Sequence, residues 1–228
     1  MALSDKKIVE ELKKGDIVIS PYNKANLSTS SYDVTLGEYY FREQTPSHYR
    51  NLYNFYDKKN TDAVWGTEAR RAKKASEALQ HFTFNFQGIA PEDKVILIDP
   101  GETILAHTAE FIGGRNHITT MMKARSSTGR NFIEVCKCAG WGDVGYINRW
   151  TLEITNNSRN YVLPLVVGRR IAQLIFFETG PILGGDYSKQ DSKYQSSADV
   201  AKLRKNWKPE MMLPQMYNDR EVTGRKKQ

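Results

Sequence analysis

From residue 82 onward the chain is a succession of short apolar segments separated by turn residues, and this pattern limits the possible folds. Each segment has four to seven residues and is rich in β-branched or aromatic side chains. The segments are residues 82–86, 95–98, 103–108, 118–122, 132–138, 151–156, 163–166 and 171–177. Turn-forming pairs such as Pro100-Gly101 and Gly113-Gly114 stand between them. Many short strands at this spacing predict a mainly β domain, a sandwich or barrel of jelly-roll type.

The N-terminal part predicts one short helix followed by further strands. Ser4 can cap a helix with an apolar stripe, and Gly15 can end it. Residues 17–19 are all apolar, and residues 30–37 alternate apolar with polar side chains as a half-buried strand does. Residues 39–41 are expected to continue the same sheet.

Residues 43–90 lack a clear period, and we interpret them as an irregular insertion and not as an independent domain. Residues 68–79 are good helix formers, so the insertion is expected to contain a short helix. This interpretation gives one catalytic domain over residues 1–200 and a basic C-terminal extension over residues 201–228.

The composition favours a soluble globular protein. Hydrophobic residues make up 39% of the chain and charged residues 26%, which does not fit a disordered chain. No apolar run approaches the ~20 residues of a membrane span, and the N-terminus has no signal-peptide core, so we expect a cytoplasmic protein without a membrane partner. The formal net charge is +7, but the basic extension alone carries +5 of it. Because a basic terminus is usually solvated, we do not expect a nucleic-acid partner.

The cysteines and histidines argue against zinc chemistry. Cys136 and Cys138 are the two cysteines of the chain. On a strand this separation places both side chains on one face, and we expect two reduced thiols. Zinc-dependent nucleobase deaminases need a Cys-x-x-Cys pair together with a His-x-Glu or Cys-x-Glu motif. None of the four histidines is followed by Glu two residues later, so we expect no zinc.

A hydroxyl-rich motif, ARSSTGR, occupies residues 124–130. If a helical turn begins there, Ser126, Ser127 and Arg130 converge on one side, because residues three and four apart share a helix face. Free amides at a helix N-terminus, hydroxyls and a guanidinium together suit a phosphate group. A simple helix cap followed by a surface arginine is the alternative that this motif leaves open.

A single carboxylate interrupts the apolar strand TLEI. In a strand, Glu153 points away from the side on which Leu152 and Ile154 lie. The flanking strands are apolar, so burial would raise the pKa of Glu153 and suit it to move protons near neutral pH. An outward-facing glutamate with a surface partner is equally compatible with the pattern.

The sequence DVGY at residues 143–146 predicts a turn in which glycine lets a ligand approach the backbone. Asp143 could accept a hydrogen bond from a sugar hydroxyl, and Tyr146 could stack on the sugar ring. Asp and Gly are also ordinary turn residues, so the motif alone does not assign a function.

In their order along the chain, these motifs resemble those of the dCTP deaminases, members of the trimeric dUTPase superfamily. The matching segments are LSDKKIVEELKKGDIVISPY, SSYDVTLG, IDPGETILAHTAE, ARSSTGR, AGWGDVGY, TLEI, GRRIAQLIF and DSKYQ. They span roughly residues 1–195, interrupted near residues 43–90. The resemblance implies a dUTPase-like distorted jelly-roll or β-barrel with a short N-terminal helix and a helical insertion. It also implies a homotrimer with active sites between subunits.

The resemblance implies catalytic roles for five residues. Glu153 resembles the glutamate that takes a proton from water and passes it toward the pyrimidine N3 and the leaving ammonia. Ser126 and Arg130 resemble residues that support the water and hold the base and phosphates, assisted by the backbone of Ala139. Asp143 resembles the residue that contacts the 3′-hydroxyl.

The resemblance also implies a nucleotide-binding set. Its members in this chain are Arg125, Ser126, Ser127, Arg130, Asp143, Tyr146, Gln173, Lys193 and Tyr194. Within the set, Tyr146 is expected against the deoxyribose. Mg²⁺ is implied as a partner of the triphosphate, without direct ligation by the protein.

The chain departs from the family pattern around the expected base site. Cys136 and Cys138 stand where the family often has His and Thr, and Asn148 stands where a glycine is usual. Ala139-Gly140-Trp141 is closer to the bifunctional members, which convert dCTP to dUMP.

The leading expectation is hydrolytic deamination of dCTP to dUTP and ammonia, for the supply of dUMP and dTTP. The alternatives are a bifunctional enzyme that gives dUMP and pyrophosphate, a plain dUTPase, and a catalytically altered nucleotide-binding regulator.

Overall fold

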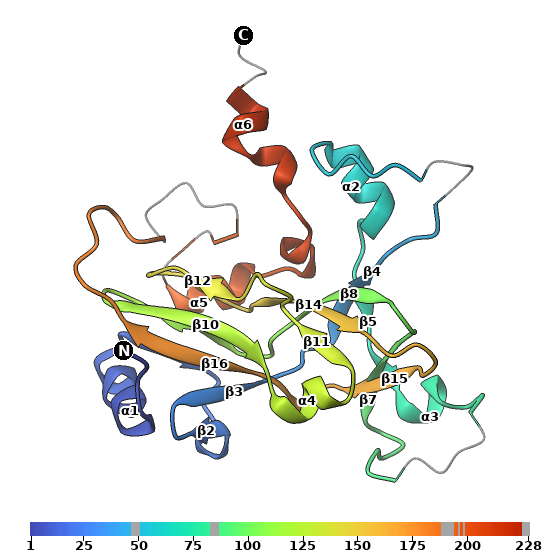
Figure 1. The fold of residues 1–228 in the computed structure, drawn as a ribbon, viewed down its shortest axis with the longest axis horizontal. Helices are drawn as coiled ribbons and strands as arrows, with labels where there is room; N and C mark the ends of the chain where they lie inside the picture. The colour runs from blue at the N-terminus through green and yellow to red at the C-terminus, as the bar shows by residue number, and fades with distance from the viewer. Residues whose placement is uncertain (47–50, 83–86, 188–193, 196, 198, 225–228) are drawn as a thin grey trace.

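Strands dominate the fold (Figure 1), which confirms the predicted mainly β architecture with a short N-terminal helix. The computed structural model describes residues 1–46, 51–82, 87–187, 194–195, 197 and 199–224. Within them lie two five-stranded sheets and two three-stranded sheets.

The first five-stranded sheet has the order β12-β10-β16-β3-β2. Its strands are β2 (Leu27–Ser28), β3 (Ser31–Thr35), β10 (Ile118–Ala124), β12 (Trp141–Gly142) and β16 (Arg170–Glu178). β16 pairs antiparallel with both β10 and β3, so that Gln173 stands between Lys123 and Asp33. This register brings the start of β16 beside the end of β10, where the ARSSTGR motif begins.

The second five-stranded sheet has the order β11-β14-β8-β4-β5 and carries Glu153. Its strands are β4 (Tyr39–Arg42), β5 (Arg70–Arg71), β8 (Thr103–His107), β11 (Ile133–Val135) and β14 (Thr151–Asn156). Glu153 on β14 is paired in register with Leu105 on β8.

Two three-stranded sheets complete the framework. One has the order β1-β9-β13, and the other has the order β15-β7-β6. Their strands are β1 (Ile17–Ser20), β9 (Phe111–Gly114), β13 (Ile147–Asn148), β6 (Lys73–Lys74), β7 (Lys94–Ile98) and β15 (Leu163–Val166).

The main apolar core joins side chains from both five-stranded sheets. Tyr32 and Phe176 of the first sheet and Ile104, Leu152 and Ile154 of the second are fully buried in it. Burial of each such side chain contributes about 1.5–3 kcal/mol. Because the two neighbours of Glu153 on β14 fill this core, the glutamate projects from the opposite face of its strand.

The predicted N-terminal helix is confirmed as α1 (Asp5–Lys14). The Ser4 hydroxyl accepts a hydrogen bond from the Lys7 amide and caps the first turn. Gly15 ends the helix with φ of 86°, a left-handed conformation that glycine adopts without strain.

The predicted helix over residues 68–79 is wrong for most of its length. Only Ala75–Ala78 are helical (α3), whereas residues 70–71 and 73–74 form β5 and β6. β5 pairs with β4 and β6 pairs with β7, and Ala72 between them is buried. These pairings outweigh a helix propensity worth only a few tenths of a kcal/mol per residue, so tertiary contacts decide the structure. The insertion's clearest helix is α2 (Lys58–Trp65), which stands away from the sheets in Figure 1.

The predicted strand over residues 132–138 is shorter than expected. β11 ends at Val135 because Cys136 and Lys137 have φ of 62° and 43°, which no extended strand accommodates. Cys136 is consequently buried and Cys138 exposed, so the expectation that both face one side is wrong. Both thiols are free. Of the strand expected at 82–86, residues 83–86 lie outside the described part of the chain.

The expectation of a solvated C-terminal extension holds for its basic side chains Lys202, Arg204, Lys205 and Lys208, which are exposed, but is wrong for Leu203 and Met212. The described elements here are α5 (Val200–Asn206), the 3₁₀ turns η3 (Pro209–Met212) and η4 (Met216–Asn218), and α6 (Arg220–Thr223). Leu203 and Met212 are each 4% exposed and pack on the sheets. Trp207 packs on His107 with ring centroids 4.7 Å apart. These apolar side chains anchor a segment whose net charge suggested solvent exposure. Among the described helices, none has the length and apolar character that crossing a membrane requires.

Candidate active site

The ARSSTGR motif forms one wall of a polar pocket. Arg125 has an extended backbone, and residues Ser126–Arg130 form the short helix α4. The pocket has a volume of about 310 Å³ and is lined by α4, β3, β16 and residues 25–28. The structure therefore brings together four of the residues expected to bind nucleotide, Arg125, Ser126, Ser127 and Gln173.

A nearly buried carboxylate positions two arginines in this pocket. Arg125 Nε and Arg170 Nη1 lie 3.2 and 3.0 Å from Asp33 Oδ2. The Asp33 side chain is 9% exposed. Gln173 Nε2 donates a hydrogen bond to the Ser31 hydroxyl at 3.1 Å. Two guanidiniums held side by side next to hydroxyls can bind a polyanion, because arginine matches phosphate oxygens with paired donors.

Arg130 does not line the pocket that Ser126 and Ser127 share. It is the last residue of α4, and its side chain is exposed. The residue spacing predicted that Arg130 shares one side of the helical turn with Ser126 and Ser127. Among the described residues that line the pocket within one chain, Arg130 is absent.

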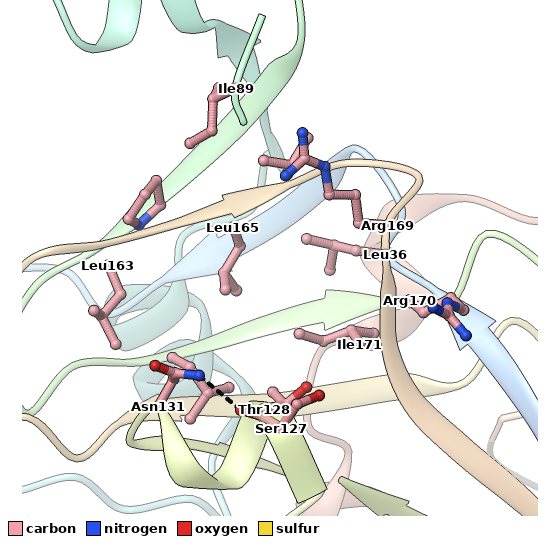
Figure 2. Close-up of a pocket in the computed structure, with 13 residues that line it drawn as sticks. Leu36, Ile89, Ser127, Thr128, Asn131, Leu163, Leu165, Arg169, Arg170 and Ile171 are labelled. Carbon is pink, nitrogen blue, oxygen red and sulfur yellow. Dashed lines mark hydrogen bonds between the residues drawn. The ribbon is translucent and has the colours of Figure 1, made fainter. Parts of the chain in front are cut away.

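A second pocket of about 380 Å³ adjoins the polar one. Ser127 and Arg170 line both pockets, and Figure 2 shows aliphatic side chains such as Leu165 and Ile171 around the second. Asn131 Nδ2 donates a hydrogen bond to the Ser127 carbonyl at 2.8 Å, drawn in Figure 2. The polar pocket thus has an aliphatic neighbour on the same surface.

Glu153 lies in a partly buried position on β14. Burial raises the pKa of its carboxyl above the ordinary value, while the Lys137 charge acts in the opposite direction. A carboxylate whose pKa is raised toward neutrality can both accept and return a proton. The sequence left open whether Glu153 is buried or faces outward with a surface partner, and the structure favours the buried orientation.

A tight turn holds residues 136–139 beside Glu153. The Cys136 amide donates a hydrogen bond to the Glu153 carbonyl at 3.1 Å, and the Ala139 amide donates to the Cys136 carbonyl at 2.7 Å. Burial, with the Glu153 charge, raises the pKa of the Cys136 thiol, which is therefore neutral. Cys136 is thus a close apolar neighbour of the glutamate, and Ala139 is presented on the exposed side of the turn.

The DVGY sequence forms the predicted turn. The Tyr146 amide donates a hydrogen bond to the Asp143 carbonyl at 3.0 Å, and the Asp143 side chain is exposed. Gly145 has φ of 93°, and a Cβ there would come within 2.9 Å of Asp186. The Tyr146 ring meets the Tyr187 ring edge to face at 5.3 Å. Burial raises the pKa of Tyr146, and the Glu153 charge contributes, which places this ring and the glutamate near one another.

The segment around residue 194 is bonded directly to this turn. Gln195 Oε1 accepts a hydrogen bond from the Ile147 amide at 2.7 Å, and its Nε2 donates to the Gly145 carbonyl at 2.9 Å. Asn148 Nδ2 donates to the Tyr194 carbonyl at 2.7 Å. Asn148, a departure from the family pattern, therefore fastens the C-terminal segment in this chain.

Tyr194 also lies near the glutamate. Its pKa is raised by burial, with a contribution from the Glu153 charge, and its hydroxyl accepts a hydrogen bond from the Gln215 amide at 3.3 Å. Lys193, the neighbouring phosphate ligand expected from sequence, lies outside the described residues.

Apart from Arg130 and Lys193, the expected site residues fall into two groups within one chain, and Arg170, which the structure adds, joins the first. The Arg125 group consists of Arg125, Ser126, Ser127, Arg170 and Gln173, and the Glu153 group consists of Ala139, Asp143, Tyr146, Glu153 and Tyr194. Among the described residues, no hydrogen bond or ion pair joins the two groups. Asp33 and Arg170 were not singled out from sequence, although both lie in the quoted motifs SSYDVTLG and GRRIAQLIF. The register of β3 against β16 brings them together, and sequence alone does not give that register.

Comparisons with known proteins agree on one family. A family model described as dCTP deaminase-like matches residues 2–179. A protein of Methanococcus aeolicus named dCTP deaminase, dUMP-forming, is 30% identical over 212 residues, which cover 90% of this chain and 99% of that protein. A Hydrogenobaculum protein of the same name is 32% identical over 77% of this chain and 81% of its own length.

Solved structures are also similar. A 2′-deoxycytidine 5′-triphosphate deaminase from Agrobacterium tumefaciens aligns with a TM-score of 0.49 at 14% identity. The alignment covers 77% of this chain and 47% of that one.

Proposed function

The chain belongs to the dCTP deaminase-like family, and from this premise we propose that it converts dCTP and two water molecules to dUMP, ammonia and pyrophosphate. The observation that carries the proposal is the partly buried Glu153, with its raised pKa, held beside the Cys136–Ala139 turn by the bond from the Cys136 amide. The names of the relatives favour the dUMP-forming reaction over the release of dUTP, which was the leading expectation from sequence.

In the first reaction Glu153 acts as the general base and acid. Its carboxylate accepts a proton from water as the water oxygen bonds to C4 of the cytosine, and it passes this proton to N3. Glu153 then takes the proton of the new C4 hydroxyl and gives it to the amino group, so that the C4–N bond breaks, ammonia leaves and the C4 carbonyl of uracil forms. A positioned acid–base group of this kind contributes roughly 10²–10⁴-fold to the rate.

In the second reaction a water molecule attacks the α-phosphorus and pyrophosphate leaves. Asp143 or Glu153 is the group that would accept the proton of this water. Asp143 would also bind the 3′-hydroxyl, with Tyr146 against the deoxyribose. The edge-to-face contact of Tyr187 with Tyr146 and the hydrogen bond from Asn148 to the Tyr194 carbonyl support a sugar site enclosed by these residues.

The polar pocket is the proposed triphosphate site. Arg125, Ser126, Ser127 and Gln173 would bind phosphate oxygens there, and Arg170 joins them because Asp33 holds it beside Arg125. Lys193 and Tyr194 are proposed as further phosphate ligands.

Mg²⁺ is proposed to enter with the triphosphate and to neutralise part of its charge. Asp33 is the one carboxylate among the described lining residues of the pocket, and two arginines already share its Oδ2. Because the pocket offers few oxygen ligands of its own, it fits a Mg²⁺ ion that is bound mainly by the triphosphate better than one bound only by protein side chains.

We further propose that the complete site forms between copies of the chain in a homotrimer. The Arg125 group and the Glu153 group remain unconnected within one chain, and Ser126 and Arg130 are exposed. In this proposal a neighbouring copy brings its Ser126 and Arg130 to the Glu153 group, in line with the active sites between subunits that the family resemblance implies. The dissolved nucleotide substrate supports a cytoplasmic location.

Product analysis on dCTP tests the reaction. The purified full-length chain is incubated with Mg²⁺ and either dCTP or, in a parallel reaction, dUTP, and nucleotides, ammonia and pyrophosphate are quantified over time. We expect dUMP, ammonia and pyrophosphate in equal amounts, without accumulation of dUTP. Ammonia with dUTP would show a deaminase alone, pyrophosphate without ammonia from dUTP would show a plain dUTPase, and no turnover of either nucleotide would leave a nucleotide-binding regulator.

A matched pair of variants tests the role of Glu153. Glu153→Gln should lower kcat for ammonia release by at least about 100-fold, because the amide cannot accept the proton. Glu134→Gln is the control, since Glu134 is also a partly buried strand glutamate but lies on the neighbouring strand β11. Equal losses in both variants would contradict the assignment.

A further inference from the structure

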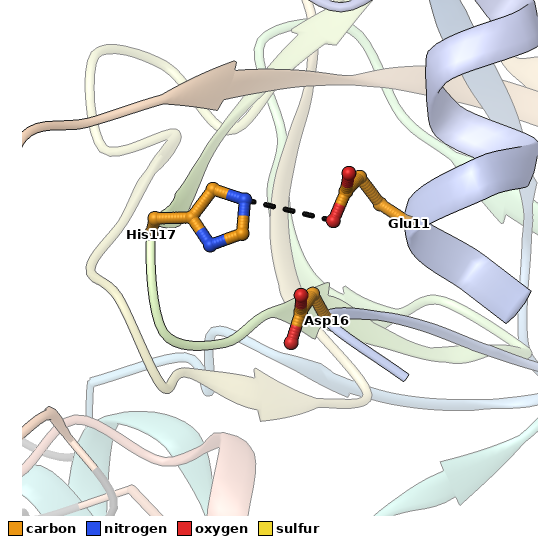
Figure 3. A group of neighbouring side chains, drawn as sticks. All are labelled: Glu11, Asp16 and His117. Atoms are coloured by element: carbon orange, nitrogen blue, oxygen red, sulfur yellow. Dashed lines mark ion pairs between the residues drawn. The ribbon is translucent and has the colours of Figure 1, made fainter. Parts of the chain in front are cut away.

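Three possible metal ligands meet where helix α1 approaches the turn between β9 and β10. Glu11 comes from the last turn of α1, Asp16 follows that helix, and His117 precedes β10. One ligand atom from each lies within 4.8 Å of the other two. Figure 3 shows the two carboxylates and the imidazole ring around one shared space.

The Glu11 carboxylate has one oxygen satisfied and one without a hydrogen-bond partner. Its side chain is 0% exposed. Lys7 Nζ and Lys14 Nζ lie 3.0 and 2.8 Å from Oε1. Oε2 has no hydrogen-bond partner, and His117 Nε2 lies 3.5 Å from it, which makes an ion pair when the imidazole is protonated. A fully buried carboxylate oxygen that makes no hydrogen bond is costly, which points to a ligand that it could hold together with His117.

The separation of Oε2 and Nε2 suits two ligands of one metal ion. At 3.5 Å it exceeds the range of about 2.7–3.2 Å for a well-formed N–H···O hydrogen bond. Two ligands that each lie about 2.0–2.2 Å from a tetrahedral zinc ion are about 3.4 Å apart. Glu11 and His117 therefore need little change of position to accept the ion, and Asp16, whose ligand atom lies within 4.8 Å of theirs, would complete the set.

The backbone holds these residues in place. The Asp16 amide donates a hydrogen bond to the Glu11 carbonyl at 3.0 Å, and the Arg115 amide donates to the Asp16 carbonyl at 2.7 Å. Asn116 Nδ2 donates to Asp16 Oδ1 at 2.5 Å and so orients that carboxylate. Such supporting hydrogen bonds around ligating groups are typical of protein metal sites.

We propose that Glu11, Asp16 and His117 bind one divalent transition-metal ion, with zinc as the best match and water in the fourth position. Imidazole nitrogen and carboxylate oxygen are both ligand types that zinc binds, whereas magnesium and calcium prefer oxygen ligands alone. The ion would join the C-terminal end of α1 to the β9–β10 turn. This structural site differs from the expectation of no zinc, which concerned the chemistry at the base.

Zinc titration of the full-length protein tests this site. All proteins carry Cys138→Ser, which removes the exposed thiol, and are first treated with a chelator. Isothermal titration calorimetry with zinc chloride should give one ion per chain, and zinc should raise the Tm. His117→Ala should weaken binding at least about 10-fold and abolish the Tm shift. Magnesium chloride should give neither effect.

Two further variants keep the test decisive. His81→Ala removes an exposed histidine elsewhere and should leave zinc binding unchanged. Asp16→Asn should weaken binding as His117→Ala does, and circular dichroism of both variants should match the parent protein, which shows that they fold. The proposal is overturned if the parent binds no zinc below about 1 mM, or if His117→Ala binds it as tightly as His81→Ala.

Discussion

Trp207 fastens the C-terminal extension to the body of the protein, and Trp207→Ala should release it. The indole ring lies 4.7 Å from the His107 ring and 6.3 Å from the Tyr39 ring, centroid to centroid. The Arg149 guanidinium lies 4.6 Å from the centre of the same ring. Removal of the ring therefore breaks contacts with two strands of the β framework and with a partly buried arginine.

The expected loss of stability follows from these contacts. Trp207 is partly buried, so the transfer of its ring from water contributes about 2 kcal/mol. The ring pair with His107 adds about 0.5–1.5 kcal/mol, and the cation–π contact adds about 0.5–1 kcal/mol. Trp207→Ala should thus lower the free energy of unfolding by about 3 kcal/mol.

A second consequence concerns His107. Burial lowers the pKa of His107 from 6.5 to about 4, and its Nδ1 is 2.8 Å from the Thr108 carbonyl while its Nε2 accepts from the Tyr39 amide. Without the Trp207 ring, water reaches the imidazole, and its pKa should rise toward the ordinary value.

Urea unfolding and NMR titration of the His107 ring measure the two effects. Trp141→Ala is the control, because that ring is 56% exposed and its loss should cost under about 1 kcal/mol. A change in unfolding free energy below about 1 kcal/mol for Trp207→Ala, with an unchanged His107 pKa, would refute this account of the extension.

Three further predictions concern pH and packing. Since the carboxylate form of Glu153 accepts the proton and burial raises its pKa, kcat/KM should fall as the pH drops through that pKa. Lys137→Gln removes a positive charge that lowers the pKa of Glu153, so the pH at which kcat/KM falls should move upward. A pH profile identical to that of the parent would contradict an interaction between Lys137 and Glu153. The folded pKa of His107 lies below its unfolded value of 6.5, so stability should be highest above pH 6.5 and fall by about 3 kcal/mol toward pH 4. The contribution of His107 to this loss of unfolding free energy, measured by urea unfolding between pH 6.5 and pH 4, should be absent in His107→Gln. Gly37→Ala places a Cβ 2.0 Å from the His107 ring and should cost about 1–3 kcal/mol, whereas Gly184→Ala, in open space, should cost under about 0.5 kcal/mol.

Local patterns in the sequence predicted the elements that local interactions specify. Ser4 and Gly15 bound α1 as expected, because capping depends on residues three or four positions away. The alternation around Tyr32 predicted β3, but the expected half-burial is wrong, because Ser31 and Asp33 are buried as well as Tyr32 and Val34. The apolar neighbours of Glu153 predicted the face from which it projects.

Long-range pairings decided what local patterns did not. Residues 70–74 favour a helix by propensity, yet they extend two sheets. Cys136 and Lys137 look like strand residues, yet their left-handed backbone ends β11 beside Glu153. Asp33 and Arg170 are far apart in the sequence, and only the pairing of β3 with β16 shows that they share a pocket.

Complementation between inactive variants tests the central claim, a deaminase site shared between copies, most directly. Ser126→Ala and Glu153→Gln chains are each assayed alone for ammonia release from dCTP, then co-expressed in equal amounts and assayed together. If each site takes Ser126 from one chain and Glu153 from another, about one quarter of the sites in randomly mixed trimers have both residues intact, and about one quarter of parental activity returns. If both residues act within one chain, no mixed site is intact, and activity no higher than that of the separate variants would contradict the account.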